Sequence, residues 1–278
     1  MHYCSQCTDS ERNDPVKRIL LTCEYDGTSY VGWQRQINGL SVQQVLEETL
    51  SSCCHEEIQV TGSSRTDAGV HARSQMVHFD TSSSIPPEKF PFVLNTMLPS
   101  DIRIQAGREV PPAFHARFLS CGKLYTYRII NNAHGSALWR LRSVHVPVKL
   151  DMDCMHRAAE TLIGTHDCAA FQASGGTAKT TIRTIDLCTV DRSEDDLITI
   201  RVHGNAFLYN MVRIIAGTLI DIGHKRRGED AFQMAFATMN RLCLGPTAPP
   251  HGLELTRVDY PEEAFIHPEA LRWHTGNP

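Results

Sequence analysis

The first regular element that the chain predicts is a β-strand over Arg18–Tyr25, because apolar and polar residues alternate there. Alternation with a period of two places one set of side chains on one face of a strand. The apolar set consists of Ile19, Leu21, Cys23 and Tyr25. Asp26 and Gly27 follow directly and are typical turn residues, so we expect the strand to end there.

An amphipathic helix is predicted to begin at Ser41, a residue type that caps helix N-termini. Gln44 lies three positions later and is placed to complete a capping box. The helix carries an apolar stripe of Val42, Val45, Leu46 and Leu50. A strand is expected around Met76–Phe79, so the first part of the chain contains strand, helix and strand in that order.

Three helices are predicted in the second part of the chain. The first, capped by Asp153, carries the apolar residues Met155, Ala158, Ala159, Leu162 and Ile163. Asn210 is expected to cap the second, a mostly apolar helix over Met211–Ile222 that Gly223 would close. The third is predicted over Glu229–Asn240. Strands are predicted in the same part over Leu124–Ile130, Thr181–Val190 and Leu197–Val202.

A boundary is predicted between residues 110 and 111, where Pro111 and Pro112 interrupt the chain after a polar stretch. We expect a flexible leader over residues 1–15, an N-terminal half over 16–110 and a C-terminal half over 111–278. The short connections between strands favour antiparallel pairing. The expected fold class is α+β: two related halves with mixed, mainly antiparallel sheets flanked by helices, and an active-site cleft between the halves.

The charge of the chain argues against a uniformly basic surface. Its 278 residues carry a formal net charge of -4, whereas nucleic-acid phosphates are bound by clustered Lys and Arg. Any basic surface must therefore be local. No apolar run reaches the roughly 20 residues that cross a bilayer, and no secretory signal precedes the ten scattered cysteines. We expect a cytoplasmic protein with reduced thiols and no membrane contact.

The segment Gly62–Asp80, GSSRTDAGVHARSQMVHFD, holds the strongest candidate for chemistry. Small residues on both sides of Asp67 predict a turn, and a predicted strand follows, so rigid elements would flank an exposed carboxylate. Arg65, two positions earlier, could hold that carboxylate ionised, as a nucleophile requires. The competing interpretation is that Asp67 only caps or stabilises the turn.

Two metal hypotheses arise from residue types, but their spacing argues against both. Asp67, His71 and His78 could bind a metal in a hydrolase, yet two histidines seven positions apart lack the i, i+4 spacing of helical zinc motifs. Cys4 and Cys7 form a CxxC pair without a second pair at metal spacing. We therefore expect no metal.

Several separated motifs resemble the tRNA pseudouridine synthases of the TruA type. Up to residue 130 they are YDGTSYVGWQRQ, SVQQVLEETL, SRTDAGVHA, LNTMLPSDIRI, FHARF and KLYTYRI. Beyond it they are GTHDCAAF, NAFLYNMVRIIAG and APPHGLELTRVDYP. Their order and spacing extend over residues 16–261, so the chain is identified as a member of this family.

The resemblance implies roles for residues of the reaction. Asp67 corresponds to the catalytic aspartate that attacks the target uridine, after which the uracil detaches, rotates and rejoins the ribose through carbon. Arg213 would be its ion-pair partner from the other half. Tyr125 would stack on the target base and assist proton removal at carbon 5. Tyr127 lies on the same strand face, so spacing alone cannot choose between the two tyrosines, but the resemblance favours Tyr125.

The resemblance also implies contacts with RNA. Arg65 corresponds to a residue that supports the flipped nucleotide, whose extrusion costs a few kcal/mol. His115 and Arg117, in FHARF, would line the RNA path, since aromatic and basic residues suit stacked bases and phosphates. Ser64 and Cys168 depart from the family pattern, where Gly and an aromatic residue are commoner.

The implied substrate is tRNA, at uridines 38 to 40 of the anticodon stem-loop, and the implied assembly is a homodimer without a cofactor. Two alternatives stay open at this stage. One is a noncatalytic RNA-binding module that keeps the fold, and the other is the metal hydrolase described above.

Overall fold

The computed structural model describes residues 15–176 and 178–271. The Cys4/Cys7 pair, and all of the predicted leader except Pro15, lie outside the described residues. The described helices are α1 Val42–Cys54, α2 Phe90–Met97, α3 Met152–Glu160, α4 Met211–Gly223 and α5 Ala231–Thr238. The described strands are β1 Lys17–Tyr25, β2 Thr61–Gly62, β3 His71–Thr81, β4 Ile102–Val110, β5 Gly122–Ile130, β6 Val144–His145, β7 Gly164–Asp167, β8 Ile182–Arg192, β9 Leu197–Gly204 and β10 Leu253–Asp259.

These strands form one mixed sheet in the order β4-β1-β3-β10-β5-β9-β8-β7, with β2 beside β3 and β6 beside β5. Two pairings are parallel, β10 with β3 and β6 with β5. The other pairings between the described strands are antiparallel. The predicted α+β class with a mixed, mainly antiparallel sheet is confirmed.

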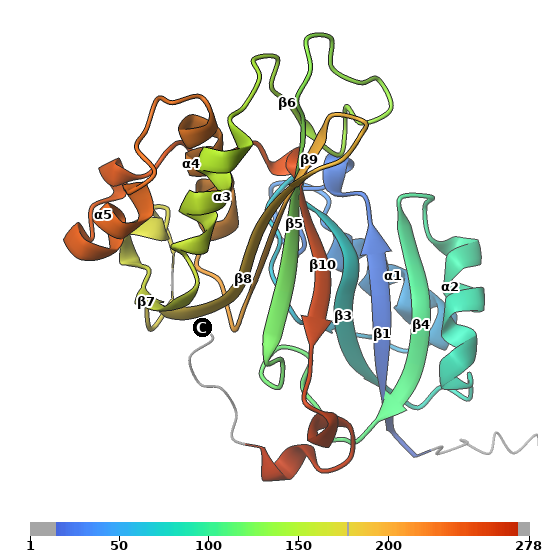
Figure 1. The fold of residues 1–278 in the computed structure, drawn as a ribbon. Helices are drawn as coiled ribbons and strands as arrows, with labels where there is room; N and C mark the ends of the chain where they lie inside the picture. The colour runs from blue at the N-terminus through green and yellow to red at the C-terminus, as the bar shows by residue number, and fades with distance from the viewer. Residues whose placement is uncertain (1–14, 177, 272–278) are drawn as a thin grey trace, which may run out of the picture.

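Strand β10 joins the two sides of the sheet. The strands that precede residue 111 lie on one side of it, and β5 to β9 lie on the other (Figure 1). Leu255 of β10 pairs with Ala72 of β3 and with Tyr125 of β5. The last strand in the chain therefore holds together the two regions that carry the predicted site residues. The division at residues 110 and 111 stays a prediction.

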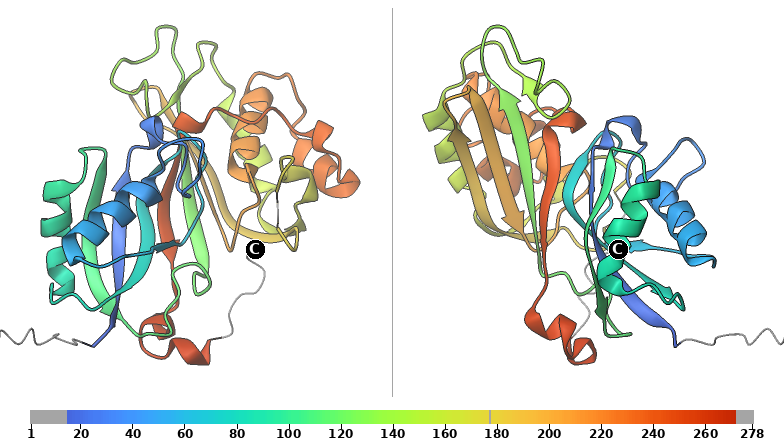
Figure 2. Two further views of the ribbon diagram at one scale, coloured as in Figure 1. Left: turned by 180° about the vertical axis from the view of Figure 1, so that it is seen from behind. Right: turned by 90° about the vertical axis from the view of Figure 1, so that its right-hand side faces the viewer.

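Helices pack on both sides of this junction. Figures 1 and 2 show α1 and α2 beside β1 and β4, α3 and α4 on the side of β5, β8 and β9, and α5 farther out at the edge of the molecule. The predicted apolar face of β1 is buried, with Ile19, Leu21 and Cys23 at 0% exposure. The apolar stripe of α1 is buried as well at Val42, Leu46 and Leu50. In the described part of the chain, no helix combines the length and the apolar character needed to span a membrane.

The capping of α1 agrees only in part with the prediction. Ser41 is the N-cap, and its Oγ accepts a hydrogen bond from the Gln44 backbone N–H at 3.2 Å. The Gln44 side chain instead donates to Glu48 at 3.0 Å. The predicted return bond, in which the Gln44 side-chain oxygen would accept from the Ser41 backbone N–H, is not formed among the described residues, because the Gln44 side chain is directed toward Glu48 one turn later.

The predicted bounds of three helices also need correction. Asp151 rather than Asp153 caps α3, and its Oδ1 accepts from the Cys154 backbone N–H at 3.2 Å. Because α3 ends at Glu160, Leu162 and Ile163 lie beyond it. Helix α5 ends at Thr238, since Met239 adopts a left-handed φ of 52°. Helix α4 includes Gly223 as its last residue, and His224 is the C-cap.

Candidate active site

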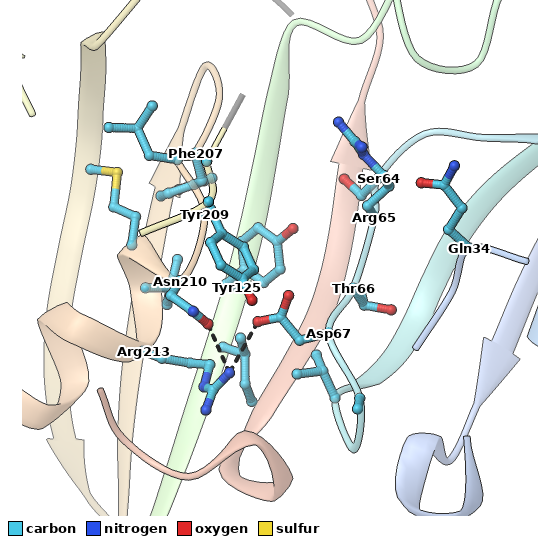
Figure 3. A pocket seen from close by; sticks show the side chains of 18 of the residues that line it. Gln34, Ser64, Arg65, Thr66, Asp67, Tyr125, Phe207, Tyr209, Asn210 and Arg213 are labelled. Atoms are coloured by element: carbon cyan, nitrogen blue, oxygen red, sulfur yellow. Dashed lines mark hydrogen bonds and ion pairs between the residues drawn. The ribbon is translucent and has the colours of Figure 1, made fainter. Parts of the chain in front are cut away.

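A pocket of about 780 Å³ lies where the two sides of the sheet meet. One wall comes from the loops around residues 31–38 and 63–68, which precede β3. The other wall comes from β5 and from the segment 207–213, which leads into α4 (Figure 3). The predicted cleft between the two halves is therefore present, and Asp67 lines it.

Asp67 sits on a turn that is fixed by a second segment of the chain. Gly32 forms a bridge with Asp67, and the Trp33 backbone N–H donates to the Thr66 carbonyl at 3.0 Å. A Cβ atom on Gly32 would lie 2.6 Å from that carbonyl, and Gly32 has a φ of 111°. Only glycine permits this close approach without strain. The Gly-Trp pair of the YDGTSYVGWQRQ motif thus positions the aspartate turn.

Gln75, on β3, holds the same turn in place by hydrogen bonds. Its side chain is fully buried, and its Oε1 accepts from Ser63 Oγ at 2.8 Å and from the Ser64 backbone N–H at 3.2 Å. Its Nε2 donates to the Ser64 carbonyl at 2.5 Å. The Gln75 side-chain amide therefore satisfies both the N–H and the C=O of the Ser64 backbone. Sequence reasoning missed this role, because Gln75 lies on a strand whose pattern shows only alternation.

Replacing Gln75 with leucine is expected to lower the free energy of unfolding by about 2 kcal/mol, since the Ser64 N–H and C=O would remain buried without partners. Activity should fall about tenfold or more, because the turn that carries Asp67 would shift. Thermal unfolding and tRNA modification rates measure the two effects. Gln59→Leu, at an exposed position, is the matched control. Equal behaviour of the two variants would contradict the positioning role of Gln75.

The Asp67 carboxylate pairs with Arg213, which comes from α4 on the opposite wall. Arg213 Nη1 donates to Asp67 Oδ2 at 3.0 Å and to Asn210 Oδ1 at 2.7 Å, and Nε donates to the Ala248 carbonyl at 2.8 Å. Three acceptors thus fix the guanidinium plane. The neighbours of Arg213 on α4 are buried apolar residues, so the carboxylate and these oxygens compensate a charge that would otherwise be costly there.

Asn210 occupies the predicted N-cap position of α4, but its side chain makes no capping bond. Its backbone has a left-handed φ of 61°. Its Oδ1 accepts from Arg213 instead. Asparagine tolerates the left-handed conformation better than most residues. Because the Asn210 side chain makes no capping bond, its amide oxygen can orient Arg213.

Arg213, rather than Arg65, is the cation paired with Asp67. In Figure 3 the Arg65 side chain extends away from the Asp67 carboxylate along the pocket wall. The turn of the chain lies at residues 68 and 69, after Asp67. Arg65 lines the pocket, but the ion pair of Asp67 in the described structure is formed by Arg213 and not by the cation that sequence spacing favoured.

Tyr125 lies on β5 next to the aspartate (Figure 3). It is 8% exposed, lines the pocket, and packs edge to face against Phe207 with ring centroids 5.1 Å apart. Burial, together with the Asp67 carboxylate, raises the pKa of Tyr125 to about 12. Its hydroxyl is thus protonated at neutral pH. Tyr127 is fully buried, donates to the Pro249 carbonyl at 2.8 Å and is not among the described residues that line the pocket.

The two predicted RNA contacts in FHARF differ in position. Arg117 lines the pocket, whereas His115 is not among the described residues that line it. His115 Nδ1 accepts from the backbone N–H groups of Arg117 and Phe118, each at 3.2 Å, and its ring stacks on Phe118. Burial lowers the pKa of His115 to about 4, so the ring is neutral. Its contact with RNA stays a prediction.

His71 and His78 do not converge on Asp67. His71 Nδ1 accepts from the Gly27 backbone N–H at 3.1 Å, and its other ring nitrogen contacts the His251 carbonyl at 3.2 Å. His78 Nδ1 accepts from the Ala116 backbone N–H at 3.1 Å. Both rings therefore support loops. Across residues 15–176 and 178–271, no group of three or more His, Cys, Asp or Glu side chains is arranged to hold a metal ion.

Sequence reasoning assigned no pocket role to Phe207, Tyr209 or Asn210, the last of which it named only as a helix cap. Phe207 contacts Tyr125, and Asn210 orients Arg213. Tyr209 lines the pocket with 46% of its surface exposed. All three belong to NAFLYNMVRIIAG, so the motif itself was the available signal. The short segment before α4 has no regular period, and for that reason pattern analysis could not place these side chains.

Comparisons with known proteins agree with this geometry. A sequence model described as tRNA pseudouridine synthase matches residues 22–119 and 158–261. A tRNA pseudouridine synthase A of Ruminiclostridium cellulolyticum is 48% identical over 245 residues, which is 88% of this chain and 100% of the relative. The protein of the same name from Geobacter sulfurreducens is 43% identical over 246 residues, again 88% and 100%. The chain therefore belongs to the tRNA pseudouridine synthase family, among the synthases of the TruA type.

Proposed function

We propose that the protein isomerises uridine to pseudouridine in tRNA and uses Asp67 as its nucleophile. The observation that carries the proposal is the Asp67–Arg213 ion pair at 3.0 Å, set in a pocket that Tyr125 also lines. The side chains of the pair are 27% and 16% exposed, so the carboxylate is reachable from the pocket. The carboxylate is the form of aspartic acid that attacks, and Arg213 holds it in place.

The reaction exchanges one bond to the ribose for another without a co-reactant. The Asp67 carboxylate adds either to the base or to the anomeric carbon, and the bond between N1 of uracil and C1′ breaks. The uracil rotates in the pocket, a bond forms between its C5 and C1′, and the bond to Asp67 breaks, which restores the free carboxylate. The C5 proton is then lost and N1 gains a proton, so the product is an isomer of the substrate. Arg213 keeps the carboxylate oriented through both bond changes.

Tyr125 has a position suited to holding the base during rotation. A flat ring on the pocket wall stacks on uracil and is tolerant of the base turning in its plane. Because its raised pKa keeps Tyr125 protonated, we propose that it acts mainly by stacking. It takes up the C5 proton only if its own proton leaves in the same step.

The charge of the pocket supports an RNA substrate. Among the described lining residues, Asp67 is the one carboxylate, and the cations are Arg35, Arg65, Arg117, Lys123 and Arg213. This local excess contrasts with the net charge of -4. We propose that Arg65 supports the flipped nucleotide and that Arg117, with His115 behind it, contacts the RNA path. The proposed targets are uridines 38 to 40 of the anticodon stem-loop, modified by a cytoplasmic homodimer.

Tritium release from unmodified tRNA labelled at C5 of uridine tests the function. We expect release in the presence of a chelator, and none from tRNA in which residues 38 to 40 are cytidines. Release from that control would show that the proposed positions are wrong. Tight tRNA binding without release would favour the noncatalytic RNA-binding module.

A further inference from the structure

Lys123 is a buried cation of the pocket to which the proposed reaction gives no role. It lies on β5 two residues before Tyr125 and lines the pocket, yet only 6% of its surface is exposed. The pKa of Lys123 is shifted by burial and by two arginines, with no anion among the causes. A cation that is largely removed from water and has no counter-charge is costly.

The charged neighbours of Lys123 increase this cost. Burial, and repulsion from Arg117 and Arg183, lower the pKa of Lys123 to about 8. Arg183 is itself only 3% exposed, and its Nε has no hydrogen-bond partner in the described part of the protein. Its Nη1 donates to Thr180 Oγ1 and to the Ile182 carbonyl. Arg117 and Lys123 line the pocket, and Arg183 lies close enough to Lys123 to repel its charge.

Strand register places two of these cations on one face of the sheet. Lys123 pairs with Gly204 of β9, and Gly204 pairs with Ile185 of β8. Arg183 lies two residues from Ile185, and residues two apart on a strand share a face. Gly204 has no side chain to fill the space between them. The face that carries Tyr125 therefore also carries Lys123 and Arg183.

The nearby carboxylates are committed elsewhere. A Cβ on Gly122 would meet Asp259, so Asp259 lies on the face opposite to Lys123. Asp259 Oδ2 pairs with His203 at 2.7 Å and Oδ1 with Arg257 at 2.7 Å. Asp67 is held by Arg213. The protein itself supplies no counter-charge to Lys123 within the described residues.

We propose that Lys123, with Arg117 and Arg183 behind it, binds one phosphodiester group of the RNA chain beside the target nucleotide. The proposal rests on the proposed function, because it takes RNA as the ligand. Two strand residues span about 7 Å, so a base stacked on Tyr125 brings its own or a neighbouring phosphate within reach of Lys123. A compact ammonium suits such a point contact.

The first test compares Lys123→Met with the matched control Lys89→Met, which changes an exposed lysine outside the pocket. Both are made in an Asp67→Asn background so that turnover does not interfere. For Lys123→Met we expect tRNA affinity to fall about tenfold and the slope of log K against log salt to shrink by about one. The melting temperature of the free protein should stay equal or rise, because an unpaired buried charge is removed. An unchanged affinity and slope would overturn the proposal.

The second test uses the Asp67→Asn protein with and without the Lys123→Met change. A series of stem-loop RNAs is made, each with a single neutral methylphosphonate linkage at a different position. The affinity of each RNA is measured for the protein that keeps Lys123 and for Lys123→Met. We expect one linkage next to the target nucleotide to weaken binding about tenfold when Lys123 is present. The same linkage should have little effect on binding by Lys123→Met. If no single linkage stands out with Lys123 present, the subsite is wrong. If that protein does not bind RNA, the proposed function fails instead, and if Asp67→Asn still forms pseudouridine, the assignment of Asp67 as nucleophile fails.

Discussion

Asp67→Asn is expected to lower the rate of pseudouridine formation about 10⁴-fold or more, the scale of loss seen when a covalent nucleophile is removed. The amide is close in size to the carboxylate and can still accept from Arg213 Nη1, which now bonds Asp67 Oδ2 at 3.0 Å. The pocket should therefore keep its shape. What the variant lacks is the charged oxygen that attacks the uridine.

Two measurements together make this prediction specific. Single-turnover tritium release reports the chemical step, and tRNA affinity at fixed salt reports binding, which should change less than about threefold. Asp195→Asn, at an exposed position, is the matched control and should behave as the unchanged protein. A rate for Asp67→Asn within about tenfold of the unchanged protein would show that another group is the nucleophile.

Arg213→Met should lower kcat about 10³-fold with a much smaller change in KM, because the charge that orients the attacking carboxylate is lost. The loss is large because one guanidinium donates to three acceptors, which all lose their donor together. They are Asp67, Asn210 and the Ala248 carbonyl. Arg213→Lys should recover only part of the rate. A point charge cannot donate to all three oxygens with the geometry of the planar fork.

Chemical rescue separates orientation from folding in this variant. Guanidinium added at millimolar concentration should restore part of the activity of Arg213→Ala and leave Asp67→Asn inactive. Arg226→Met, at an exposed position beyond the end of α4, serves as the matched control. A parallel fall in kcat and melting temperature, without rescue, would indicate that Arg213 only stabilises the fold.

The two halves of the site differ in how far they could be predicted. The turn with Asp67 and the strand after it follow from local residue types, and the structure confirms a turn that leads into β3. Its ion-pair partner is 146 positions away in the sequence. No local pattern carries that information, and spacing alone favoured Arg65. The family resemblance identified Arg213 because it compares whole motifs rather than neighbours.

Helix ends show the same limit at a smaller scale. Asp151 and Asp153 are equally good cap residues by type, and only the hydrogen bond from Cys154 to Asp151 decides between them. For Asn210, the sequence predicted that the side-chain oxygen would cap the helix, but this oxygen accepts a hydrogen bond from Arg213 instead. In each case several partners compete for one polar group, and the distances in the folded chain select among them.

The sequence by itself determined the elements and the fold class, because alternation and helical periodicity record which face of each segment is buried. It also determined, through its motifs, the family and the residues worth testing. The tertiary structure decided what those residues contact. Strand β10 brings β3 and β5 together, and that closure places Asp67, Arg213, Tyr125 and Lys123 around one pocket. Contacts across such distances depend on the packing of the whole sheet, which no segment specifies alone.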